Sequence, residues 1–149
     1  SDASLGVIRI LDEPIRWVNL YNKTYASPDS SYSVRQTEYG VPDSRIGATF
    51  PKVVIRTVRV KAVPVFGKVI DVRWEGKESG LGLIDRLTGD VSLARPIMDS
   101  YDLRVAAYPR HGCWILSVYV LSAPSMELWN CYQSIASHLL DLPVPFSES

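Results

Sequence analysis

The sequence predicts an α+β fold, in which a mainly antiparallel β-sheet packs against one C-terminal α-helix. Apolar and polar side chains alternate over residues 56–63 and 69–74, which is the period of a β-strand. Over residues 125–142, apolar side chains instead recur at the spacing of an amphipathic helix. With 149 residues, 46% of them hydrophobic, the chain can form one domain, residues 1–149, around a single core.

Two short strands are expected near the N-terminus. Residues 5–11 and 15–20 are apolar runs with β-branched side chains. Asp12, Glu13 and Pro14 between them are typical of a turn.

Residues 21–50 are predicted to form a long polar loop, because serine, aspartate, proline and glycine accumulate there without a sustained period. A short helix or an edge strand near residues 32–37 is an alternative. Connections longer than about 12–15 residues are uncommon in compact domains and are typically functional or disordered. The loop is therefore either a disordered insertion or a partner-binding segment. If it binds a partner, deletion of residues 27–40 is expected to spare folding and abolish association. The side chains expected to bind the partner are Tyr25, Tyr32, Val34, Tyr39 and Val41.

The strand expected over residues 56–63 has an apolar and a largely basic face. Its even-numbered positions from Val58 onward are apolar and are expected to face the core, with the odd-numbered positions in solvent. Arg56 lies in phase with the apolar positions, which implies a β-bulge or a buried ion pair.

The second half of the chain is expected to supply further strands. Residues 81–85 lead into Leu87-Thr88-Gly89-Asp90, which is typical of a tight hairpin before residues 91–93. Alternation predicts a strand over residues 102–108, and the apolar run at residues 113–121 predicts a central strand covered on both faces.

The C-terminal helix has recognisable boundaries. Ser122 or Ser125 is expected as its N-cap, because a serine hydroxyl can accept a hydrogen bond from a backbone N–H of the first turn. Pro143 and Pro145 are expected to end it, which leaves residues 143–149 as a polar tail.

The charge balance argues against a general polyanion-binding protein, since 16 basic and 16 acidic residues cancel and specific nucleic-acid readout is not expected. A local basic stripe on neighbouring strands could still bind phosphates, lipid headgroups of an anionic membrane or an acidic protein. A solvated face with lysines protecting a sheet edge is the alternative. The basic residues concerned are Lys52, Arg59, Lys61, Lys68 and Arg73.

No catalytic residue, metal site or cofactor is predicted. His111, Cys113, Cys131 and His138 fit none of the standard zinc spacings, and neither histidine is flanked by a motif that would orient it for a cysteine nucleophile. The glycine-rich residues 80–82 lack the third glycine and the Lys-Ser/Thr of a phosphate-binding loop, and no helix is expected after them. Enzymatic activity is therefore not favoured.

The cysteine content indicates a reducing, intracellular compartment. Two cysteines are too few for a disulfide scaffold, so free thiols are favoured, although Cys113 and Cys131 would pair if their strand and helix brought them together. The longest apolar run, residues 113–121, is far shorter than the roughly 20 residues that span a bilayer, and no basic-then-apolar leader is expected. A peripheral membrane location stays compatible with these features.

One segment has a family resemblance. Residues 122–134, Ser-Ala-Pro-Ser-Met-Glu-Leu-Trp-Asn-Cys-Tyr-Gln-Ser, and the strand before them resemble the C-terminal strand and helix of rhabdovirus matrix proteins. Those proteins are small structural domains that self-associate, condense nucleocapsids and contact the inner membrane leaflet. The resemblance implies packing roles for Met126, Leu128 and Trp129 and transfers no catalytic residue. This chain departs from the family in its net charge of zero.

Three functional hypotheses follow from the sequence. The leading one is a non-catalytic binding or assembly domain, similar to a viral matrix protein that self-associates and contacts membrane or nucleocapsid through its loop and basic face. The second is a small-molecule-binding domain or weak enzyme with a pocket between helix and sheet, lined by Trp114, Trp129 and Tyr132. The third, a pleckstrin-like lipid or peptide module, rests only on strands that precede one C-terminal helix.

Overall fold

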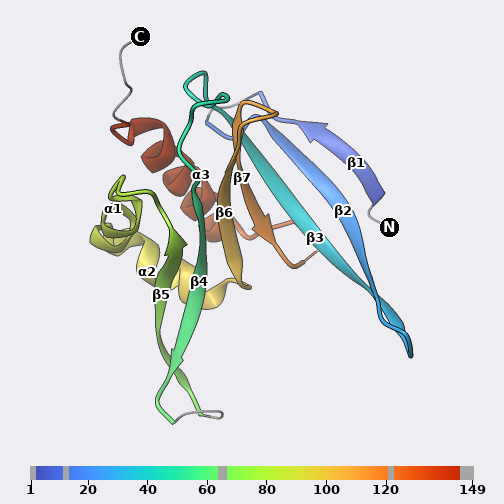
Figure 1. The fold of residues 1–149 in the computed structure, drawn as a ribbon. Coiled ribbons are helices and arrows are strands. Elements are labelled where there is room, and N and C mark those ends of the chain that lie inside the picture. Colours follow the sequence, from blue (N-terminus) through green and yellow to red (C-terminus); the bar gives the residue numbers. More distant parts are fainter. Residues whose placement is uncertain (1–2, 12–13, 64–66, 121–122, 145–149) are drawn as a thin grey trace.

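The computed structural model describes residues 3–11, 14–63, 67–120 and 123–144, which form one antiparallel sheet with helices on one face (Figure 1). Its elements are β1 (Ala3–Arg9), β2 (Trp17–Ala26), β3 (Ser31–Pro42), β4 (Val54–Lys61), β5 (Val69–Lys77), α1 (Leu83–Gly89), the 3-10 turn η1 (Val91–Leu93), α2 (Ala94–Asp99), β6 (Leu103–Tyr108), β7 (Cys113–Val118) and α3 (Met126–Asp141). The seven strands are ordered β1-β2-β3-β7-β6-β4-β5. The α+β class predicted from the sequence is confirmed.

The two faces of the sheet are set by its contact with α3. Tyr39 of β3 packs against Trp129 and Tyr132 of α3, at ring-centroid distances of 6.0 and 5.1 Å. Tyr39 is paired with Leu116 of β7, which is fully buried, so both face the helices. We call this side the helix face and the opposite side the far face. Side chains one residue away along each strand point to the far face.

The long loop expected over residues 21–50 is wrong for most of its length. Residues up to Ala26 continue β2, and residues from Ser31 form β3, so the two strands make a ten-pair hairpin closed by residues 27–30. The strand pattern was hidden because this ribbon extends beyond its neighbours, so that polar side chains suit both of its faces. The alternative of an edge strand near residues 32–37 agrees better with the structure, because these residues belong to β3 and pair with β7 only from Thr37 onward.

The structure argues against the expectation that residues 27–40 can be deleted without unfolding. β3 pairs with β2 on one side and with β7 on the other. Its residues Gln36, Thr37, Tyr39 and Gly40 are buried. Removing them would split the sheet.

β4 has the opposite orientation to the one expected. Ile55 and Thr57 are buried on the helix face, whereas Val58 and Val60 are half-buried on the far face. Arg56 shares the far face and is exposed, so it needs neither a bulge nor a buried partner. The alternating period predicted for this strand is present. However, the distal part of β4 is paired with β5 alone, so Val58 and Val60 do not pack in the core.

Between residues 83 and 99 the chain forms α1, η1 and α2, where strands and a hairpin were expected. Leu83 and Leu87 of α1 are buried four residues apart, and Leu93 and Ile97 repeat that spacing through η1 and α2. α1 and α2 lie beside β5 and α3 (Figure 1). Because each apolar stripe has only two members, the helical period is too brief to stand out from the surrounding polar residues.

The end of the chain follows the prediction closely. Ser125 is the N-cap of α3, and its hydroxyl oxygen accepts a hydrogen bond from the backbone N–H of Leu128 at 3.1 Å. β6 and β7 form the centre of the sheet, and every residue of β7 is buried. The strand ends at Val118, three residues earlier than expected, and Pro145 lies outside the described residues.

A polar cluster joins the segment after β3 to the end of α3. Arg45 donates to the Asp43 carboxylate at 2.8 Å and to the backbone oxygen of Leu139 at 2.9 Å, and also to that of Leu142. The indole N–H of Trp114 donates to Asp43 at 3.0 Å. Burial opposes the ionisation of Asp43, but the hydrogen bonds from Arg45 and Trp114 outweigh it and hold its pKa below the usual value.

Candidate functional site

The distal part of the β2–β3 hairpin, residues 23–34, projects from the rest of the sheet (Figure 1). β1 pairs with β2 only as far as Asn22, and β7 pairs with β3 only from Thr37 onward. Within the described parts of the chain, residues 23–34 are therefore paired only with each other. We call this segment the hairpin tip.

Two tyrosines form the main apolar surface of the hairpin tip. Tyr25 and Tyr32 are directly paired across the strands, and their rings stack at a centroid distance of 5.3 Å with an interplanar angle of 24°. Tyr32 is 61% exposed. The ammonium group of Lys23 lies 5.5 Å from the centre of the Tyr25 ring, where a cation–π contact stabilises the ring's position.

The turn of the hairpin is held by its two serines. The backbone N–H of Ser27 donates to the carbonyl of Ser30 at 2.7 Å, and the N–H of Ser30 donates to the Ser27 hydroxyl at 3.2 Å. These bonds close the turn and hold the two strand ends in register. The tyrosine pair is therefore presented on an ordered ribbon.

The five residues expected to bind a partner separate into two groups. Tyr25, Tyr32 and Val34 lie on the hairpin tip, where Val34 is half-buried opposite Lys23. Tyr39 and Val41 are buried in the core and belong to the packing of the sheet against α3. Burial raises the pKa of Tyr39, as expected for a hydroxyl removed from water.

The five basic positions do not form one stripe. Lys61, Lys68 and Arg73 are exposed on the distal part of the β4–β5 hairpin, which we call the basic hairpin. β6 pairs with β4 only over Val54–Arg56, so this ribbon also projects from the sheet (Figure 1). Lys52 lies before the other end of β4.

Arg59 has a structural role. Its guanidinium donates to the carbonyl of Met98 at 3.0 Å, to that of Ser100, and to Asp102 at 3.4 Å. These contacts satisfy carbonyl groups at the end of α2. Arg59 is therefore engaged with α2 and the following loop, rather than displayed to a partner.

The two thiols are unsuited to nucleophilic chemistry. Cys113 and Cys131 are free and buried, on β7 and α3 respectively. Cys113 precedes helix-face Trp114, so it lies on the far face and the sheet separates it from Cys131. Burial raises the pKa of Cys113 and raises that of Cys131 to about 12, so neither is a thiolate at neutral pH.

His138 of α3 contacts Asp90, which is the N-cap residue of η1. Its Nε2 lies 2.7 Å from the Asp90 carboxylate, which also accepts from the backbone N–H and the hydroxyl of Ser92 at 3.1 and 2.6 Å. Hydrogen bonds from Ser92 and then from His138 lower the pKa of Asp90. In a Ser-His-Asp triad the serine must hydrogen-bond to the imidazole, whereas here Ser92 is bonded to the carboxylate. Among the described residues, no three His, Cys, Asp or Glu side chains are arranged to hold a metal ion.

An apolar groove of about 340 Å³ separates the start of α3 from the helix face of the first strands. Its lining includes Ile8, Val18, Leu20, Tyr39, Pro124 and Trp129. Of the three aromatic residues expected to line a pocket, Trp129 does so, whereas Trp114 and Tyr132 are buried in the core.

No family model, curated protein or solved structure matches this chain, so the interpretation of its surfaces rests on their geometry. No helix in the described parts of the chain is both long and apolar enough to cross a membrane.

Proposed function

We propose that this chain is a non-catalytic assembly domain that self-associates through the hairpin tip, in the manner of a small viral matrix protein. The observation that supports the proposal is the stacked pair of Tyr25 and Tyr32 on a ribbon that pairs with no further strand among the described residues. The proposed partner is a second copy of the same chain.

A ribbon of this kind has low stability by itself. An isolated two-stranded hairpin is marginally stable in water, and here twelve residues extend beyond both neighbouring strands. Aromatic rings at such a position add little to the core. Tyrosine offers a large, rigid contact surface at low entropic cost, which is why it is enriched at interaction hot spots.

The charge of the chain favours association with itself. With a net charge of zero, two copies do not repel each other at long range. Within the hairpin tip, Lys23 and Asp29 supply one charge of each sign, which allows the tips of two copies to approach without a charge conflict.

The test is the solution mass of the chain, measured by light scattering over a range of protein concentration. The mass of the unmodified chain should rise with concentration, and the double variant Tyr25→Ser with Tyr32→Ser should weaken association about tenfold or more, as expected for hot-spot residues. Tyr101→Ser is the matched control, since Tyr101 is also 61% exposed but lies between α2 and β6.

A chain that stays monomeric at every concentration would contradict the proposal. So would association that the double variant leaves unchanged. Far-ultraviolet circular dichroism of the variants shows whether the sheet is intact.

The basic hairpin supports a second contact, with an anionic membrane surface. Lys61, Lys68 and Arg73 lie on this hairpin, and Asp71 is the acidic residue in its described part. A basic residue near an anionic leaflet contributes about 1 kcal/mol, so Lys61→Glu with Lys68→Glu should weaken binding to phosphatidylserine vesicles by at least about tenfold. Vesicle co-sedimentation measures this, and binding that persists in the variant would exclude the basic hairpin as the contact.

The apolar groove supports the alternative of a small-molecule-binding domain. Its volume of about 340 Å³ lies within the range of ligand pockets, and its lining is mainly aliphatic and aromatic. A thermal-shift screen of apolar ligands should then raise the unfolding temperature of the unmodified chain but not that of Leu20→Arg. The basis for a pleckstrin-like module is removed, because α1 and α2 precede β6 and α3 is not the only helix.

A further inference from the structure

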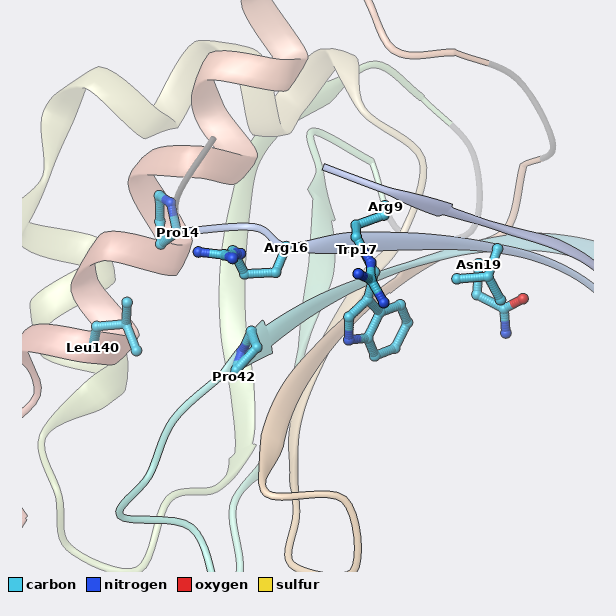
Figure 2. A pocket seen from close by; sticks show the side chains of 8 residues that line it. Arg9, Pro14, Arg16, Trp17, Asn19, Pro42 and Leu140 are labelled. Carbon is cyan, nitrogen blue, oxygen red and sulfur yellow. The ribbon is translucent and has the colours of Figure 1, made fainter. Parts of the chain in front are cut away.

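A second groove, of about 670 Å³, lies at the end of β2 opposite to the hairpin tip (Figure 2). Arg9, Arg16, Trp17, Asn19, Pro42 and Leu140 contribute to its lining. Figure 2 shows Trp17 with Arg9 beside it, Asn19 towards one end, and Arg16, Pro14 and Leu140 towards the other. We call it the tryptophan groove.

The indole of Trp17 occupies a place made by Gly40. Arg9, Trp17 and Gly40 are directly paired across β1, β2 and β3, and Trp17 lies on the far face because its neighbour Val18 pairs with Tyr39. A Cβ atom on Gly40 would lie 1.8 Å from Cε2 of Trp17. One face of the indole therefore rests on the backbone of β3, and the half-buried ring contributes its remaining surface to the groove.

The backbone that carries Arg16 is fixed on several sides. The N–H of Arg16 donates to the carbonyl of Gly40 at 2.9 Å, and its carbonyl accepts from the N–H of Ile10 at 2.7 Å. The N–H of Ile15 donates to Oε1 of Gln133 on α3 at 3.1 Å, and the side chain of Ile15 is fully buried. The start of β2 is thus anchored to both the sheet and α3.

The charged side chains in the described lining of the groove have one sign. Among the described residues that line it, Arg9 and Arg16 are the charged ones, and both are arginines. Asn19 is held in place, since its Nδ2 donates to Glu38 at 3.2 Å and its Oδ1 accepts from the Ser4 hydroxyl at 2.6 Å. Guanidinium groups bind phosphate oxygens in a bidentate geometry that suits phosphate esters.

From this arrangement we propose that the tryptophan groove binds a nucleoside phosphate, with the base stacked on Trp17 and the phosphate bound by Arg9 and Arg16. A flat aromatic surface beside cationic groups is the combination that proteins use for unpaired nucleotides, since every base has a π-face and every phosphate is anionic. The groove volume lies within the range of small-ligand sites. The ligand is either a free mononucleotide or one nucleotide of a single strand.

Nucleotide binding and self-association would use different surfaces of the chain. The groove lies at the start of β2, whereas the hairpin tip lies at its end. Arg9→Gln and Trp17→Phe should leave the solution mass unchanged, so failure of one proposal does not affect the other.

The first measurement is tryptophan fluorescence of the intact chain titrated with adenosine monophosphate. Stacking should quench Trp17, and Trp17→Phe should abolish the quenching, because Trp74 and Trp114 are buried and Trp129 lies on the helix side. Inorganic phosphate, which has no base to stack on Trp17, should bind at least about fivefold more weakly than the mononucleotide.

The second measurement is fluorescence anisotropy of a labelled single-stranded RNA of about ten nucleotides, over a range of salt. Arg9→Gln should weaken binding and reduce the slope of log affinity against log salt by about 0.7. Trp17→Phe should retain part of the affinity, since it keeps an aromatic ring. Arg95→Gln is the control, because Arg95 is exposed on α2, which packs beside β5 and α3.

Equal affinity for the mononucleotide and the RNA identifies a free nucleotide as the ligand, and much tighter binding of the RNA identifies a single strand. No quenching by either ligand, quenching that survives in Trp17→Phe, or phosphate binding as tightly as the mononucleotide would overturn the proposal.

Discussion

At Gly40, the absence of a side chain lets Trp17 lie against β3. Atoms of the indole would be 1.8, 2.2 and 2.4 Å from a Cβ at this position, which no small adjustment relieves. At Gly47, by contrast, a Cβ would have no neighbour within 4 Å. The two glycines therefore provide a matched pair, in which only one is needed for packing.

Gly40→Ala should lower the free energy of unfolding by about 1–3 kcal/mol, because the indole must leave its place. Gly47→Ala should change it by less than about 0.5 kcal/mol. Urea unfolding measures both. In a Trp17→Ala background the cost of Gly40→Ala should largely disappear, and equal costs in both backgrounds would show that the indole is not the cause.

Asp43 and Arg45 form the other residue-scale feature with a measurable consequence. The side chain of Asp43 is 4% exposed and that of Arg45 is 25% exposed. Because the folded-state pKa of Asp43 lies below that of an ordinary aspartate, its ionised form stabilises the fold at pH values above the ordinary pKa. This contribution is lost as the pH falls through the folded-state pKa.

Arg45→Met should lower the free energy of unfolding by about 2–3 kcal/mol at neutral pH, since it leaves a buried carboxylate without its cation. It should also reduce the loss of stability between about pH 5 and pH 3, because the favourable ionisation of Asp43 is gone. Urea unfolding at the two pH values tests both. An unchanged pH dependence would assign the acid sensitivity to other carboxylates, such as Asp90.

At the scale of elements, the two projecting hairpins differ from the strands they continue. Among the residues that the structure describes, the hairpin tip pairs only with itself beyond Asn22 and Thr37, and the basic hairpin does so beyond Arg56. The central strands instead have neighbours on both sides and pack against α3. A hairpin end can therefore be removed without exposing the core, which is not true of β3 as a whole.

Replacing Tyr25–Tyr32 by Asn-Gly, so that a tight turn joins Thr24 to Ser33, should preserve the fold and change its stability by less than about 1 kcal/mol. The same variant should not self-associate. Deletion of residues 27–40 should unfold the chain. Loss of cooperative unfolding in the short replacement would show that the tip stabilises the body of the domain.

At the scale of the whole molecule, stability should decrease from the centre of the sheet towards the two hairpin ends. β7 is buried along its whole length between β3 and β6, and the fully buried Ile135 and Leu139 of α3 belong to the same core. In the described part of the chain, no strand pairs with either edge of the hairpin tip beyond the last paired residues of β1 and β7.

Amide hydrogen exchange should reveal this gradient. The amides of β6 and β7 should exchange only on global unfolding, whereas those of residues 23–34 should exchange through local opening at far lower free energy. Protection of the hairpin tip that rises with protein concentration would accompany self-association. Uniform protection across both regions would contradict the proposed gradient.

The sequence alone determined the elements that carry a strong local pattern. α3 was predicted with Ser122 or Ser125 as its N-cap, because amphipathic spacing and capping are encoded within one segment, and Ser125 is the cap. β6 and β7 followed from alternation and from a continuous apolar run. Tyr25 and Tyr32 were predicted as partner-binding residues of a loop, whereas they lie on the paired strands β2 and β3.

The tertiary structure decided which face of each strand is buried and which distant residues meet. Val58 and Val60 have the right period but point away from the helices, because burial depends on which strands and helices cover that part of the sheet. The tryptophan groove was not predicted, since Arg9, Trp17 and Gly40 come together only through the register of three strands. A local pattern specifies a period, whereas the choice of face and the formation of a site require the partners that only the folded chain supplies.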